Sequence, residues 1–279
     1  MTISINNAST VLAARQSLEK SGAALGKNFQ RLSSGLKINS ASDGGGAVAV
    51  AMRMASQISG TTAAKKNAND ALSLLQVADS ALNETATALQ KVRDLAVDAN
   101  TDTKSSNDRL ALKAEVTGLV TEINRLATGT EIFGKKVLDG TLTANVQIDP
   151  NVGTNHVLAV VLGGTSLGHL DLGTSGSKLN VSTAGSASAA IAVADAALNS
   201  VAMLRATVGA MQNRLESIIN SLDSSSLAYT EARSRVMDAD VAEESSDMAR
   251  NTIRQQAAVA ILSQANMQSK SLLKLLDNA

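Results

Sequence analysis

The chain has 279 residues with 25 basic and 25 acidic side chains, so it lacks the positive field that nucleic-acid binding requires. It contains no cysteine, which excludes disulfides and thiolate chemistry. Hydrophobic residues make up 44% of the chain, but it has one tyrosine, two phenylalanines and one proline. This composition favours long packed helices over an aromatic-lined cleft.

Residues 1–35 predict a first amphipathic helix. Gly35 is placed to end it, because glycine readily takes the left-handed conformation. A glycine-rich polar turn over residues 40–46 follows, in which Ser42 and Asp43 are expected helix caps. The apolar stripe of the helix repeats at about heptad spacing and contains Val11, Leu18, Leu25, Phe29 and Leu32.

A second long helix is predicted over about residues 47–100. Its apolar positions recur in steps of three and four, as expected for a helix that packs lengthwise against another, and include Leu75, Leu82 and Leu89. After a polar turn, a third and shorter helix is predicted to stop near Gly129 and to fold back along the second.

The pattern changes between about residues 140 and 186. Residues 145–148 and 156–162 are rich in β-branched and aliphatic side chains, and the turn sequence Asp-Pro-Asn-Val-Gly separates them. These features predict a β-hairpin. The Gly/Ser/Thr-rich stretch 163–188 that follows is expected to be a loop or weak strand.

The longest apolar seam runs over residues 194–236 and spans about 65 Å as a helix. It predicts an elongated helical rod. Residues 250–279 predict a further helix, and polar joints separate both terminal helices from the central seams, so each needs a partner. The long seam includes Val201, Val208, Leu215, Leu222 and Tyr229, and the last helix carries Ala258, Leu262, Ala265, Leu272 and Leu276.

No catalytic constellation, cofactor motif or metal site is evident. The two histidines, His156 and His169, lie in the hairpin and loop segment without a third ligand at motif spacing, although an enzyme acting through them stays open as an alternative. The acidic residues of 238–247 lack a calcium-loop pattern and are expected to be caps and a solvated face. The first ten residues lack the features of a cleavable signal peptide, and the longest aliphatic run, 157–162, is too short to span a membrane.

Two motif sets resemble those of a known family. Residues 32–41 (LSSGLKINSA), with Asp43 and the preceding Ile5-Asn6-Asn7, closely resemble the amino-terminal signature of bacterial flagellins. The carboxy-terminal signature is similar to residues 233–240 (RSRVMDAD), 244–249 (ESSDMA), 253–257 (IRQQA) and 264–266 (QAN). The similarity covers roughly residues 1–140 and 186–279.

The resemblance implies a secreted structural subunit, without enzyme activity, that polymerises helically into the bacterial flagellar filament for swimming motility. It implies a mainly α fold with discontinuous domains. Residues 1–40 and 238–279 would form a terminal coiled coil that lines the filament core, and residues 41–237 a helical rod with a hairpin and a short variable loop at about 140–186. The stripes of the two terminal helices would make the polymerisation contacts, and large outer domains would be missing.

The implied partners are further copies of the chain, sibling flagellins, an export chaperone at the carboxy-terminal tail, the flagellar export apparatus, and cap and hook-junction proteins. A hook–filament junction protein or an exported helical adhesin is the alternative, since junction relatives share terminal helices.

Residues 89–97 also resemble a family segment that an innate immune receptor reads. Lys91, Arg93, Leu95 and Glu115 would form that surface. Lys91 stands where arginine is usual, and lysine lacks the planar fork of arginine, so weakened recognition is expected.

Overall fold

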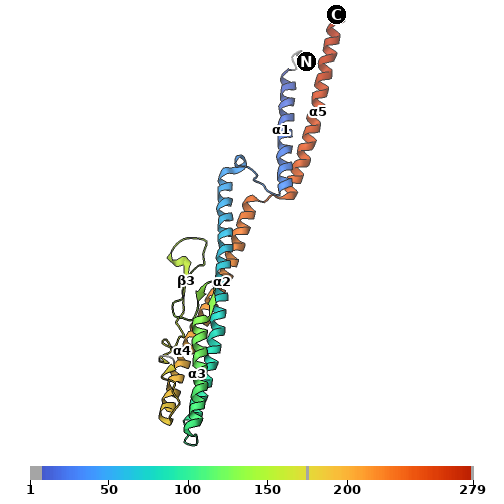
Figure 1. Ribbon diagram of the computed structural model, residues 1–279. Helices are drawn as coiled ribbons and strands as arrows, with labels where there is room; N and C mark the ends of the chain where they lie inside the picture. Colours follow the sequence, from blue (N-terminus) through green and yellow to red (C-terminus); the bar gives the residue numbers. More distant parts are fainter. Residues whose placement is uncertain (1–7, 174–175, 278–279) are drawn as a thin grey trace. The chain divides into compact units, whose positions relative to one another are not determined.

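The computed structural model describes residues 8–173 and 176–277 and divides into two compact units. Unit 1 comprises Met1–Ser56 and Ala228–Ala279, and unit 2 comprises Gln57–Leu227. The predicted class, mainly α with a small β-hairpin, is confirmed (Figure 1). The helices are α1 (Ala8–Ser34), α2 (Ala41–Ala99), α3 (Ser106–Gly129), α4 (Ala184–Met237) and α5 (Val241–Asp277), with a 3-10 turn η1 (Thr154–His156) and the strands β1 (Glu131–Ile132), β2 (Lys135–Lys136), β3 (Thr143–Gln147) and β4 (Val157–Val161).

The core of unit 2 is built from the seams of α2 and α4, with α3 and the β3–β4 hairpin packed against them. Leucines and valines at steps of three and four fill it, because this spacing keeps them on one side of each helix. Tyr229, the last residue assigned to the long seam, is 36% exposed and lies in unit 1, so its inclusion was wrong. The other seam residues are all buried: Leu75, Leu82, Leu89, Val201, Val208, Leu215 and Leu222.

By length and composition alone, one stretch of α4 could cross a membrane, with a mean hydropathy of 1.6. A core helix passes the same test. The alanines of this helix at positions 187, 190, 194 and 197 are fully buried in the core of unit 2, which accounts for part of its apolar character.

Charged pairs join α2 to α4 within unit 2. Arg93 Nε lies 2.6 Å from Asp195 Oδ1, Asp79 Oδ1 lies 2.9 Å from Arg205 Nε, and Lys65 Nζ lies 2.6 Å from Asp223 Oδ1. Residue numbers rise along one helix as they fall along the other, so the helices are antiparallel. The sign on α2 alternates from positive to negative to positive at intervals of 14 residues.

These three charged pairs oppose a slip of α2 along α4. An apolar seam of alanine and leucine repeats every heptad and fixes the register weakly. A slip of about two heptads in either direction would bring Asp79 towards Asp195 or Asp223, and like charges repel. The alternating signs therefore favour the observed register.

The β3–β4 hairpin is antiparallel, with Thr143 opposite Val161 and Gln147 opposite Val157. Its turn lies close to α2, where Gly60 makes room for it. A Cβ at Gly60 would lie 2.5 Å from the Cβ of Pro150, so a larger residue would push the turn away. The hairpin was predicted from the sequence, but the two-residue strands β1 and β2 before it were not.

The segment from Gly163 to the start of α4 is a loop in its described part, one of the two alternatives that its composition predicted. In its described part, Leu170, Leu172, Leu179 and Val181 are buried and belong to the core of unit 2. They form two pairs, each spaced by two residues, and neither pair is long enough to give a periodic pattern that would assign it to the core. The segment therefore covers the core rather than extending from it.

We predict that Asp79→Arg destabilises unit 2, because it places a second cation beside the Arg205 guanidinium. The expected loss is about 0.5–1 kcal/mol, since the native pair is partly exposed. The double substitution Asp79→Arg with Arg205→Asp should recover most of it. Urea unfolding followed by circular dichroism measures both, with Asp70→Arg as the control, because Asp70 is an exposed carboxylate on the same helix. An equal loss in the control, or no recovery in the double variant, would contradict the register role.

Candidate assembly site of the paired terminal helices

In unit 1, α1 and α5 lie side by side, and they run in opposite directions (Figure 1). Gly35 ends α1 with φ of +70°, as its position in the sequence predicted. Two backbone hydrogen bonds then join the connectors of the two chain halves. The Lys37 amide donates to the Met237 carbonyl at 2.6 Å, and the Ala239 amide donates to the Gly35 carbonyl at 2.9 Å.

Polar side chains stabilise the connector between α1 and α2. The Ser40 amide and hydroxyl donate to Asp43 Oδ2 at 3.1 and 2.8 Å, and the hydroxyl bond lowers the pKa of this carboxyl below its ordinary value. Because α2 begins at Ala41, Asp43 lies in its first turn, and its carboxylate accepts the Ser40 amide as in a capping box. The predicted capping role therefore holds for Asp43, whereas Ser42 lies inside the helix. Gly44 then interrupts the helix with non-helical backbone angles.

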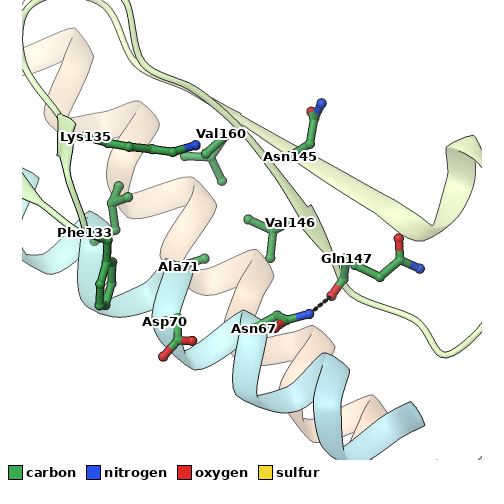
Figure 2. Close-up of a pocket in the computed structure, with 11 residues that line it drawn as sticks. Asn67, Asp70, Ala71, Phe133, Lys135, Asn145, Val146, Gln147 and Val160 are labelled. Carbon is green, nitrogen blue, oxygen red and sulfur yellow. Dashed lines mark hydrogen bonds between the residues drawn. The ribbon is translucent and has the colours of Figure 1, made fainter.

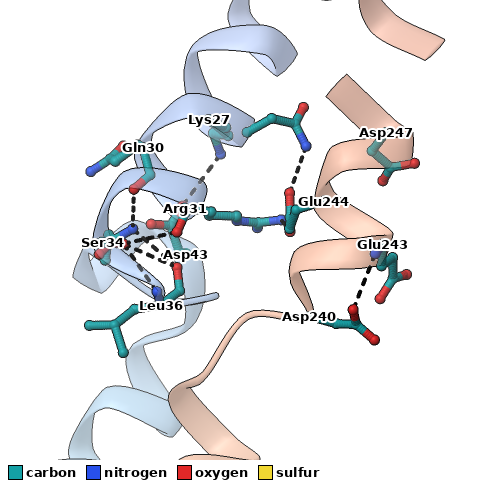
Figure 3. Close-up of polar contacts among 12 residues, drawn as sticks. Lys27, Gln30, Arg31, Ser34, Leu36, Asp43, Asp240, Glu243, Glu244 and Asp247 are labelled. Carbon is teal, nitrogen blue, oxygen red and sulfur yellow. Dashed lines mark hydrogen bonds and ion pairs between the residues drawn. The ribbon is translucent and has the colours of Figure 1, made fainter. Parts of the chain in front are cut away.

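A buried polar cluster joins α1 to α5, and we call it the Glu244 cluster (Asn28, Arg31, Glu244 and Asn251). The Asn28 amide donates to Glu244 Oε2 at 2.6 Å, and the Arg31 guanidinium donates to Oε1 at 2.8 Å (Figure 3). The Asn251 amide donates to Asn28 Oδ1 at 3.1 Å. Asn28 is 6% exposed and Glu244 is 7% exposed.

This cluster can fix the pairing of the two helices. Each Glu244 oxygen has a charged or amide donor, so the buried carboxylate is compensated only when both helices are in this register. Buried polar side chains set register and orientation in the same way in coiled coils. The prediction of a solvated acidic face was wrong for Glu244, whereas Asp240 does cap α5 through the amides of Ala242 and Glu243.

The apolar burial between α1 and α5 is small. Leu25 and Ala258 are buried, whereas Phe29, which was expected to widen the packed stripe, is 58% exposed and so does not pack within this pair. Leu272 and Leu276 belong to α5, but their side chains lie outside the described part of the chain. Five predicted residues are partly buried: Val11, Leu18, Leu32, Leu262 and Ala265.

Several large hydrophobic side chains of the α1–α5 pair remain uncovered. Large hydrophobic side chains on both helices are more than half exposed, which is unusual for a monomer surface when they gather on one element. They are Leu12 and Phe29 on α1, and Ile253, Val259, Ile261 and Met267 on α5.

The predicted receptor-surface residues all lie in unit 2. Lys91 on α2 and Glu115 on α3 are exposed, and Leu95 is partly buried. Arg93 is held by Asp195, and this hydrogen bond raises the pKa of the guanidinium above its ordinary value.

The two histidines lie apart in contacts of their own. His156 Nδ1 is 3.2 Å from Asp149 Oδ1, and His169 Nδ1 is 2.7 Å from the Ser166 hydroxyl. Within residues 8–173 and 176–277, no three histidine or carboxylate side chains are grouped as a metal site.

A mainly α chain whose two terminal helices pair with each other has the architecture of a helical structural protein. Sequence comparison agrees with this class. The bacterial flagellin N-terminal helical region matches residues 5–143, and the bacterial flagellin C-terminal helical region matches residues 191–276. The chain belongs to the bacterial flagellin family and is a structural subunit of the flagellar filament.

Individual relatives span nearly the whole chain. The chain is 35% identical to the flagellin of Bacillus subtilis strain 168, over 98% of this chain and 99% of the relative. It is 34% identical to the flagellar filament 33 kDa core protein of Treponema phagedenis, over the same shares. The crystal structure of Bacillus cereus flagellin is 28% identical, covers 56% of this chain and 88% of its own, and has a TM-score of 0.49. The two family matches and the curated relatives give no support to the alternative of a junction protein or adhesin.

We predict that Glu244→Ala weakens the α1–α5 pair, because it leaves the buried Asn28 amide and the Arg31 guanidinium without their acceptor. The expected cost is about 1–3 kcal/mol. The temperature at which filaments depolymerise should fall, while the melt of unit 2 should not change. Glu243→Ala is the matched control, since Glu243 is its exposed neighbour. Equal depolymerisation temperatures for both variants would show that the cluster does not stabilise the assembled state.

Proposed function

We propose that α1 and α5 form the polymerisation domain of this flagellin. Other copies of the chain would cover the apolar side chains that the two helices leave exposed. The domain comprises residues 1–40 and 238–279, and residues 41–237 form the helical rod domain. The observation that carries the proposal is the set of uncovered apolar side chains on the pair, such as Phe29 on α1 and Ile253 on α5. A helical polymer needs contacts between different patches of neighbouring copies, and these exposed side chains can supply such contacts.

The small core of unit 1 supports the same proposal. Among its described residues, the buried apolar side chains larger than alanine are Leu25 and Ile38. Helices in proteins gain most of their stability from the packing of an amphipathic face, so helices with little packing are weakly stabilised. We infer that neighbouring subunits complete the burial, so that ordering of the two helices is coupled to assembly.

Marginal terminal helices also suit export in an unfolded state. The chain has no cysteine, so no disulfide would have to be broken before passage through a narrow channel. The proposed route is the flagellar export apparatus, with a chaperone on the carboxy-terminal tail before export. Assembly beyond the hook-junction proteins and beneath the cap, alone or with sibling flagellins, would place the subunit outside the cell.

The receptor-facing surface of Lys91, Arg93, Leu95 and Glu115 is proposed to bind the innate receptor weakly. Lysine at position 91 cannot form the two parallel hydrogen bonds of an arginine. Arg93 would have to leave its bond to Asp195 or share it with the receptor.

We predict that removing residues 263–279 abolishes polymerisation, because it deletes part of the α5 surface that pairs and assembles. The melt of unit 2 should stay nearly unchanged. Purified chain seeded with filament fragments, followed by sedimentation and electron microscopy, measures the effect.

Ser263→Ala and Gln264→Ala are the controls, because both keep the helix and change exposed positions. Filaments grown from the truncated chain would contradict the proposed role of α5. Failure of the unaltered chain to extend seeds would contradict the proposal as a whole.

A further inference from the structure

Unit 2 has a groove to which neither terminal helix contributes a residue, and we call it the Phe133 groove. Its volume is about 340 Å³. Asp70 and Leu74 on α2 form one wall, Val146 and Val160 of the β3–β4 hairpin form another, and Phe133 and Lys135 of the β1–β2 hairpin stand at its edge. Figure 2 shows these elements around one hollow, with the Asn67 amide donating to the Gln147 carbonyl beside it.

Phe133 has a left-handed backbone conformation that glycine and asparagine adopt more readily. Ile132 pairs with Lys135, so Phe133 and Gly134 form a two-residue turn, with φ of +51° and +73°. Such turns favour Asn-Gly, because both central residues need a left-handed backbone. An aromatic residue rarely adopts this conformation.

The fold gains little from this aromatic ring. Phe133 is 69% exposed, although it is one of three aromatic residues in the chain. A disfavoured backbone that holds an exposed ring at the edge of an apolar groove is the arrangement of a contact residue. Aromatic side chains are enriched among the residues that dominate protein interfaces.

Charges at the groove indicate what kind of surface would fit it. Asp70 and Lys135 are both exposed, and neither has an ion-pair partner in the part of the chain that the structure describes. The groove therefore presents one free anion and one free cation. A nucleic acid or an anionic membrane offers a single sign of charge, whereas a surface of this chain, with 25 charges of each sign, offers both.

We propose that the Phe133 groove is a contact surface for a second copy of this chain, with the Phe133 ring as its apolar anchor. The identity of the partner rests on the proposed function, but the surface lies in unit 2 and is separate from α1 and α5. A subunit in a helical array meets several neighbours through different patches, so a second patch on unit 2 adds contacts that the terminal helices do not make.

Phe133→Asn separates a contact role from a structural role. Asparagine tolerates the left-handed backbone, so the melting temperature of unit 2 should stay the same or rise. The critical concentration for seeded polymerisation should rise about tenfold or more, because an aromatic anchor is lost. Val152→Asn is the matched control, since Val152 is 96% exposed in the hairpin turn and does not line the groove.

A crosslink identifies the occupant directly. Because the chain has no cysteine, Asn145→Cys introduces a single thiol at the groove that can carry a benzophenone crosslinker. Irradiated filaments should give covalent dimers of this chain, and dilute monomer should give none. Peptide mapping of the dimer then locates the contacting surface on the second copy.

Three results would overturn the groove proposal: a lower melting temperature in Phe133→Asn, equal critical concentrations for Phe133→Asn and Val152→Asn, or filaments without dimer. The proposed function is tested separately. Filaments from the chain without residues 263–279 would contradict the role of α5 and leave the groove result standing. Normal assembly of Phe133→Asn would contradict only the groove.

Discussion

A long helix with one apolar stripe is stable only when another surface covers that stripe along its length. Unit 2 meets this constraint internally, since Leu82 on α2 and Leu215 on α4 are buried in one continuous core. Unit 1 meets it only in part, because α1 and α5 bury Leu25 and Ala258 but leave Phe29 exposed. The constraint is therefore met within unit 2, whereas unit 1 leaves large apolar side chains uncovered in the single chain.

Polar interactions decide which helices pair, because the apolar stripes are too repetitive to do so. In unit 1 the buried Glu244 carboxylate has donors on α1 in one register. In unit 2 the alternating pairs around Asp79 and Arg205 favour one register of the α2 and α4 seams. A subunit that refolds after export would need such markers, since a slip by whole heptads keeps most apolar contacts.

Hydrophobic periodicity in the sequence predicted the long helices and most of their buried positions. Steps of three and four located α2 and α4 and most of their buried residues, and turn chemistry located the β3–β4 hairpin. The apolar pattern continues to Tyr229, but this side chain is exposed, so periodicity placed the end of the buried seam too late in the sequence. Periodicity could not identify Asn28 as a partner of Glu244, because the two residues are 216 positions apart in the sequence. It also missed β1 and β2, because two-residue strands have no repeat and Phe133 stands where such a turn favours asparagine.

Amide hydrogen exchange can show whether the terminal helices acquire their stability from assembly, as we propose. Exchange should be compared in dilute monomer and in filaments, with the α2 and α4 seams of unit 2 as the internal reference. We expect weak protection of residues 11–32 and 258–276 in the monomer and strong protection of both segments in the filament, with the α2 and α4 seams protected in both states. Strong protection of both terminal segments in dilute monomer would contradict this proposal.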